Sequence, residues 1–163
     1  MGHSMNNNIE KYGYNDFFER QIDELNISSE NLIPARVIEV QKEQYKLVTE
    51  YGENAGKLKG SLFYNDKIYN VYPTIGDFVL LRHNPLGEDI IYHVLERKSK
   101  FSRLDSFNKV EQIIAANFDY VFIMLSLNND FSLKRTERYL TAAWQSGALP
   151  VIIMTKLDLY TTL

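Results

Sequence analysis

The sequence predicts a small all-β barrel preceded by a short helix and followed by part of an α/β sheet. Two observations predict this combination. Five short apolar segments, separated by turn residues, lie between residues 34 and 97. Near the end of the chain, two continuous apolar runs flank a single helical pattern. With 163 residues, the chain has room for two small domains.

Composition limits the classes of function. Apolar residues make up 45% of the chain, so a buried core is expected, and the formal net charge is only -3. Binding to nucleic acid would therefore need a local basic patch. The chain has no cysteine, which excludes disulfides and thiolate metal sites within it. No apolar stretch approaches the length of a transmembrane helix, so we expect a cytoplasmic protein with no membrane contact.

Residues 1–33 form a leader. Residues 1–4 resemble a vector-derived tag before a native start at Met5. Three apolar residues then recur at helical spacing, which predicts a short helix: Phe18, Ile22 and Leu25. Asn15 or Asp16 can cap its start.

Residues 34–97 are predicted to form the barrel. The expected strands are residues 35–40, 45–51, 58–64, 78–82 and 90–95. Five short strands at this spacing fit a five-stranded Greek-key barrel of the OB type, which usually binds nucleic acid on an open face.

Residues 98–118 are predicted to be a basic connector. The candidate RNA contacts at and around it are Arg97, Lys98, Lys100 and Arg103, with Lys57 and Lys59 of the barrel as weaker candidates. Phe101 and Phe107 either offer a stacking surface for bases or pack between the domains. His83 and His93 have no ligand partners at metal spacing, so ordinary sheet or surface roles are expected for both.

Residues 119–163 show a different periodicity. The apolar run 119–125 predicts a strand that is buried on both faces. Ser132 can cap a helix that ends at Gly147. One side of this helix carries Leu133, Leu140, Ala143 and Trp144. We expect Trp144 and Tyr139 to be core or helix-packing residues and not a platform for a base. A second buried strand at 151–154 completes a βαβ unit, which belongs to a parallel sheet.

The second strand leads directly into Thr155-Lys156-Leu157-Asp158. Ligands of open α/β sheets bind at this edge. The four residues match the guanine-specificity motif of GTPases, [Asn/Thr]-Lys-x-Asp. A carboxylate can accept two hydrogen bonds from N1–H and the N2 amino group of guanine, whereas adenine has no such donor pair. The alternative is a solvated lysine and aspartate at a strand end.

A GTP site also needs a phosphate loop, Gly-x-x-x-x-Gly-Lys-[Ser/Thr], between a strand and a helix. The nearest match is the segment from Gly52 to Leu58, which is one residue short and ends in leucine. We expect it to be a hairpin turn of the barrel. If the guanine motif is real, the phosphate loop must follow Leu163, which implies a circularly permuted P-loop GTPase domain in a chain that is cut short.

Together, these motifs resemble the ribosome small-subunit-dependent GTPases, the RsgA or YjeQ family. Besides Thr155-Lys156-Leu157-Asp158, six short segments carry the resemblance in order: Tyr14-Asn15-Asp16-Phe17-Phe18, Ile33-Pro34-Ala35-Arg36-Val37, Ile75-Gly76-Asp77-Phe78-Val79, Lys100-Phe101-Ser102-Arg103, Glu111-Gln112-Ile113-Ile114-Ala115-Ala116-Asn117-Phe118-Asp119 and Arg138-Tyr139-Leu140. The resemblance covers nearly the whole native chain.

The resemblance implies GTP hydrolysis during late maturation of the 30S ribosomal subunit, with 16S rRNA as a partner. It implies that Asp158 reads guanine, Lys156 stacks on the base and Thr155 braces the site. GTP or GDP with Mg²⁺ would be bound by the full-length protein, and zinc by a C-terminal domain. Residues 119–163 would then be the truncated start of a GTPase domain, inactive alone. The competing hypothesis is a non-enzymatic OB-fold module that binds RNA.

Overall fold

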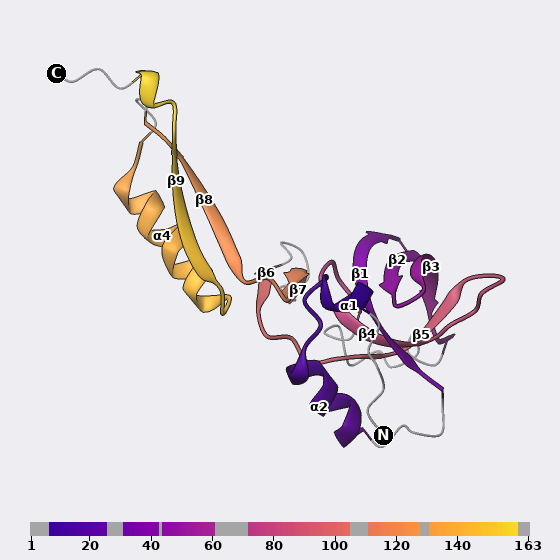
Figure 1. Cartoon of the computed structure of the whole chain (residues 1–163). Helices are drawn as coiled ribbons and strands as arrows, with labels where there is room; N and C mark the ends of the chain where they lie inside the picture. The colour runs from indigo at the N-terminus through magenta and orange to yellow at the C-terminus, as the bar shows by residue number, and fades with distance from the viewer. Residues whose placement is uncertain are drawn as a thin grey trace.

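The computed structural model describes residues 7–25, 31–42, 44–60, 72–104, 111–127 and 131–159. In these residues, a barrel near the N-terminus is followed by a two-stranded hairpin and then by a βαβ unit (Figure 1). The βαβ unit points away from the barrel, and the hairpin lies between the two parts. The predicted combination of fold classes is confirmed.

The barrel has five strands: β1 (Ile33–Gln41), β2 (Gln44–Thr49), β3 (Gly52–Leu58), β4 (Phe78–Arg82) and β5 (Asp89–Val94). They close in the order β1-β2-β3-β5-β4, with β4 pairing back onto β1. All neighbours are antiparallel except β3 and β5. This is the OB-type barrel that the sequence predicts. Fully buried aliphatic side chains, including Leu47, Leu81 and Ile91, fill its interior.

Two helices cover the outside of β4. These are α1 (Asn7–Glu10) and α2 (Asp16–Glu24), and Asn15 caps α2 by accepting a hydrogen bond from the Phe17 amide at 3.1 Å. Phe18 packs against Phe78 of β4, with ring centroids 4.2 Å apart. The predicted leader helix and its cap are thus confirmed.

The segment from Gly52 to Leu58 is strand β3, so its prediction as a hairpin turn is wrong. The turn precedes this strand, at residues 50–51. The strand was predicted at 58–64, but the observed strand ends at residue 58. Residues 59 and 60 are not in a strand, and 61–64 lie outside the described residues. The polar composition of β3 gives no apolar pattern from which a strand could be predicted. Both of its edges are paired, and a Cβ at Gly56 would lie 2.4 Å from Leu47 Cδ1.

The predicted connector folds into an antiparallel hairpin, β6 (Lys100–Leu104) and β7 (Glu111–Ala116). Asn117 ties it to the barrel from a left-handed backbone conformation, φ 54°. Its side chain accepts a hydrogen bond from the Lys98 amide at 2.8 Å and donates one to the Gly76 carbonyl at 3.1 Å. Its own carbonyl accepts one from Arg36 at 2.9 Å. The hairpin is therefore docked on the barrel.

The βαβ unit consists of β8 (Tyr120–Ser126), α4 (Leu133–Gln145) and β9 (Leu149–Thr155), and its two strands are parallel. Ser132 caps α4, and Gly147 follows the helix with φ +89°. This unit and both ends of its helix are as predicted.

Both strands of this unit were predicted to be buried, but one face of their sheet is exposed. Ile123 and Leu125 pack under Ala143 of α4, but Phe122 and Met124 on the other face of β8 are 66% and 67% exposed. Within the described residues, no element packs on that face, so β8 is buried on one side only. The second strand, β9, was also predicted to be buried, but its Ile152 and Met154 are 42% and 63% exposed. Two aromatic residues of α4 that were expected in the core are also exposed, Tyr139 and Trp144.

Candidate functional site at the carboxyl edge of the parallel strands

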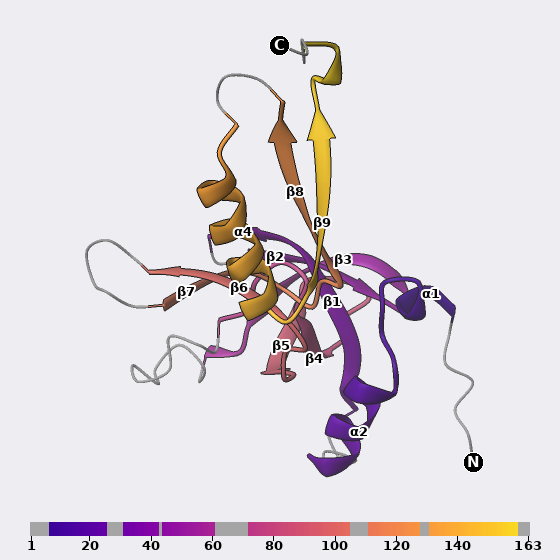
Figure 2. The ribbon, with the colours of Figure 1, turned by 90° about the vertical axis from the view of Figure 1, so that its left-hand side faces the viewer.

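The parallel strands β8 and β9 bring two chain segments together at their carboxyl ends. Their pairing runs in register from Tyr120 opposite Leu149 to Ser126 opposite Thr155. Both strand arrows in Figure 2 point toward the C-terminal end of the chain. The guanine-type motif begins where β9 ends, which is the edge where open α/β sheets bind ligands.

Thr155 joins the two strand ends. Its side chain is half-buried, and its hydroxyl donates a hydrogen bond to the Leu125 carbonyl at 3.2 Å. Its carbonyl accepts a hydrogen bond from the Leu127 amide at 3.0 Å. The loop after β8 and the motif after β9 are therefore fixed relative to one another at their first residues.

Lys156 and Asp158 lie beyond the sheet and are exposed. The backbone of Lys156 has φ 58°, a left-handed conformation that residues other than glycine rarely adopt. Leu157–Leu159 then form a single 3-10 turn that contains Asp158. This change of backbone direction takes the lysine and the carboxylate out of the strand and leaves both accessible to a ligand. Strained backbone of this kind is common at functional sites.

The described residues hold the guanine-type motif at this edge of the sheet but no phosphate loop. Among the residues that the structure describes, the nearest match to such a loop is strand β3, whose Gly56 packs against Leu47 and Asp89 in the barrel. It is itself a strand paired on both edges and not a loop between a strand and a helix, so it cannot hold phosphate in the usual way. In the same parts of the chain, no group of three or more His, Cys, Asp or Glu residues could hold a metal ion.

Three of the predicted RNA-binding cations are paired with carboxylates. Arg97 makes a two-pronged ion pair with buried Asp77, at 2.7 Å and 2.6 Å. Its side chain is only 12% exposed, so this guanidinium is part of the protein's own structure. The ion pairs of Lys57 with Glu88, 3.1 Å, and of Lys100 with Glu111, 2.9 Å, are far more exposed.

The other three cations have neutral partners. Lys98 donates a hydrogen bond to the Asn15 side chain at 2.9 Å and lies over the rings of Phe17 and Phe18. Arg103 donates to the side chain of Gln112 at 3.1 Å. The Lys59 ammonium lies 4.2 Å from the ring centroid of Tyr92. Lys59, Lys98 and Arg103 are all exposed.

Sequence reasoning missed one member of this group. Tyr92 is in β5, which lies between β3 and β4. Lys59 follows β3, and Arg82 at the end of β4 reaches the same ring from the opposite side, with its guanidinium carbon 5.0 Å from the centroid. The alternation along β4 contained the signal, since Val79 and Leu81 face the barrel interior and Arg82 faces outward with Leu80. Of the two aromatics in the predicted connector, Phe101 is 40% exposed and Phe107 lies outside the described residues.

The fold and the site thus define a class: an OB-type barrel joined to a βαβ unit whose second strand leads into a guanine-type motif. Residues 94–163 match the family model of the RsgA GTPase. "Small ribosomal subunit biogenesis GTPase RsgA 1" from Listeria innocua is 46% identical over 151 residues, which are 93% of this chain. The chain belongs to the RsgA family.

Two solved structures share the fold at 20% sequence identity. YjeQ from Thermotoga maritima has a TM-score of 0.63 and matches 80% of this chain and 43% of its own. YloQ, described as a circularly permuted GTPase, has a TM-score of 0.61 and matches 82% of this chain and 44% of its own. The chain spans 40% of the length of the Listeria innocua relative. No helix in the described parts of the chain is long and apolar enough to cross a membrane.

Proposed function

We propose that this chain is part of a GTPase that acts in late maturation of the small ribosomal subunit. The observation that carries the proposal is the position of Thr155-Lys156-Leu157-Asp158 at the shared carboxyl edge of two parallel strands. The names of the relatives, which are small ribosomal subunit biogenesis GTPases, support the same function.

In this proposal, Asp158 recognises guanine. Its carboxylate accepts hydrogen bonds from N1–H and from the N2 amino group, and both bonds are charge-assisted. The Lys156 stem lies along the flat face of the base. Thr155, already bonded to the end of β8, keeps the motif in place while the base is bound.

The full-length protein would supply the rest of the reaction. A phosphate loop would bind GTP together with Mg²⁺, and a separate domain would bind zinc. This chain alone is expected not to hydrolyse GTP. The exposed face of β8 and β9 would be covered by further helices of the same domain, because parallel sheets are normally covered on both faces.

The barrel and the hairpin would bind 16S rRNA in the cytoplasm. The exposed cations that lack a carboxylate partner among the described residues are the first candidates: Lys59, Arg82, Lys98 and Arg103. Phosphate contacts from such residues would position the protein without reading sequence.

The proposal is tested with the full-length protein encoded by the parent gene. We expect a Gly-x-x-x-x-Gly-Lys-[Ser/Thr] loop soon after Leu163, and GTP hydrolysis that increases when purified 30S subunits are added. A parent gene without that loop, or a full-length protein whose hydrolysis does not respond to 30S subunits, would contradict it. An RNA-binding barrel without enzymatic activity would then be the better account.

A further inference from the structure

Two turns at one end of the barrel bring an aromatic pair together. Tyr51 lies in the turn between β2 and β3, and His83 follows β4 at the start of the turn to β5. Their rings are stacked, with centroids 4.7 Å apart and planes inclined by 23°. Tyr51 is 65% exposed although it is large and aromatic. The pair therefore presents a flat ring to solvent at the end of the barrel.

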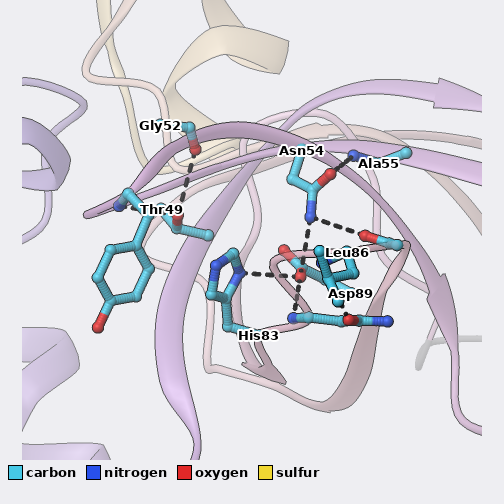
Figure 3. A network of polar contacts seen from close by, with 10 residues as sticks. Thr49, Gly52, Asn54, Ala55, His83, Leu86 and Asp89 are labelled. Atoms are coloured by element: carbon cyan, nitrogen blue, oxygen red, sulfur yellow. Dashed lines mark hydrogen bonds and ion pairs between the residues drawn. The ribbon is translucent and has the colours of Figure 1, made fainter.

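His83 is held in place by a buried carboxylate. Its Nδ1 lies 3.0 Å from Oδ1 of Asp89, which is fully buried. The same oxygen accepts hydrogen bonds from the Asn54 side chain at 3.0 Å and from the Asn84 amide at 2.8 Å (Figure 3). A carboxylate oxygen accepts, so Nδ1 of His83 carries the proton and the ring has one fixed orientation.

The turns themselves are rigidly built. The side-chain Nδ2 of Asn54 also donates to the Gly87 carbonyl at 3.1 Å, which links β3 to the turn between β4 and β5. The Tyr51 amide donates to the hydroxyl of buried Thr49 at 3.1 Å. Leu86, whose amide donates to the Asn84 side chain, is 98% exposed at the tip of its turn. A preorganised surface loses little conformational entropy when it binds.

Charge near the pair favours a base over a phosphate as its ligand. Glu50 adjoins Tyr51 and raises the pKa of its hydroxyl, and Glu88 lies in the other turn. The neighbouring outer face of β3, β5 and β4 is basic, with Lys59 and Arg82 over the ring of Tyr92. Arg82 immediately precedes His83. An RNA strand could place phosphates on this face and a base on the aromatic pair.

We propose that Tyr51, backed by His83, is a stacking site for an unpaired RNA base, and that Lys59 and Arg82 bind the adjoining phosphates. Aromatic side chains bind bases in this way on OB-fold surfaces, and the turn between β4 and β5 is one of the loops that OB-folds use for oligonucleotides. This inference rests on the RNA-binding part of the proposed function and names the residues that carry it.

The test measures binding of the whole chain to a fluorescein-labelled single-stranded RNA 12-mer, by anisotropy at fixed salt. Tyr51→Ala is expected to weaken binding about tenfold or more, since that is the range for loss of one stacked base. Tyr51→Phe keeps the ring and should bind like the unsubstituted chain. Tyr139→Ala removes an exposed aromatic from α4, away from the barrel, and is the matched control.

An abasic oligonucleotide of the same length separates base from phosphate contacts. The Tyr51→Ala defect should vanish with it, whereas Lys59→Ala should weaken binding of both oligonucleotides. If Tyr51→Ala binds the RNA as tightly as Tyr51→Phe does, the stacking site is refuted and RNA binding by the barrel stands. If the unsubstituted chain binds no RNA at all, the RNA-binding part of the proposed function fails, and this inference fails with it.

Discussion

Strands β4 and β8 are alike in sequence and opposite in burial. Both are continuous apolar runs, Phe78-Val79-Leu80-Leu81 and Tyr120-Val121-Phe122-Ile123-Met124-Leu125. All four apolar residues of β4 are buried, because the barrel interior takes one face and helix α2 takes the other. In β8, only Ile123 and Leu125 are buried, since α4 covers one face.

The comparison shows what an apolar run reveals. An apolar run indicates that both faces of a strand are suited to burial. It does not indicate which segment covers each face. For β4, the cover comes from residues that precede it in this chain. For β8, the cover of one face is not found among the described residues, and in our proposal it belongs to the rest of a GTPase domain.

The largest expected effect contrasts a side chain from each region. Leu81→Ala empties part of the closed barrel core and should cost about 2–5 kcal/mol of unfolding free energy. Met124→Ala, on the bare face, should change it by no more than about 0.5 kcal/mol. Urea unfolding followed by amide NMR signals of each region measures both. Equal losses would mean that the bare face is covered in solution.

A second variant tests whether the hairpin is docked on the barrel. Gly76 has φ +91°, and a Cβ there would lie 2.0 Å from the Ala116 carbonyl oxygen. Gly76→Ala should therefore cost about 1–3 kcal/mol and accelerate hydrogen exchange of the Ala116 amide, which is bonded to the Ile75 carbonyl. Gly60→Ala is the control, because nothing lies within 4 Å of that Cβ. Unchanged exchange at Ala116 would argue against docking.

The smallest expected effect concerns the hairpin itself. Hydrogen bonds from Ser102 and Lys100 hold the pKa of Glu111 below its ordinary value. A carboxyl whose pKa is lower in the folded state stabilises that state when the pH is above the pKa of the unfolded chain. This contribution disappears as the pH falls through the pKa of the folded state. Since Glu111 is solvent-screened, Glu111→Gln should cost only about 0.2–0.5 kcal/mol at neutral pH.

Unfolding free energies of Glu111→Gln and of the unsubstituted chain should converge in acid. A Glu111→Gln defect that persisted below the ordinary glutamate range would assign the stabilisation to something other than this charge.

Much of the fold could be predicted because local signals coincide with the observed elements. Asn15 and Ser132 cap their helices, and Gly147 ends the second one. Strand β3 was missed because its polar residues and two glycines carry no strand signal. Its pairing with β5, which is far away in sequence, is what makes it a strand.

The site was only partly predictable for a similar reason. Thr155, Lys156 and Asp158 could be found because they are contiguous and follow an apolar run. Pairing between distant residues was invisible, so Arg97 could not be recognised as the partner of buried Asp77. The role of Asn117 depends on contacts with residues 36, 76 and 98, and no local pattern encodes these contacts.

Guanine recognition by Asp158 is the central claim, and nucleotide affinity of the full-length protein tests it most directly. Asp158→Asn removes two charge-assisted bonds, each worth about 1.5–3 kcal/mol. We therefore expect GDP affinity to fall by about a hundredfold or more, and xanthosine diphosphate to bind better than GDP. Unchanged GDP affinity in Asp158→Asn would contradict the assignment of this carboxylate to guanine.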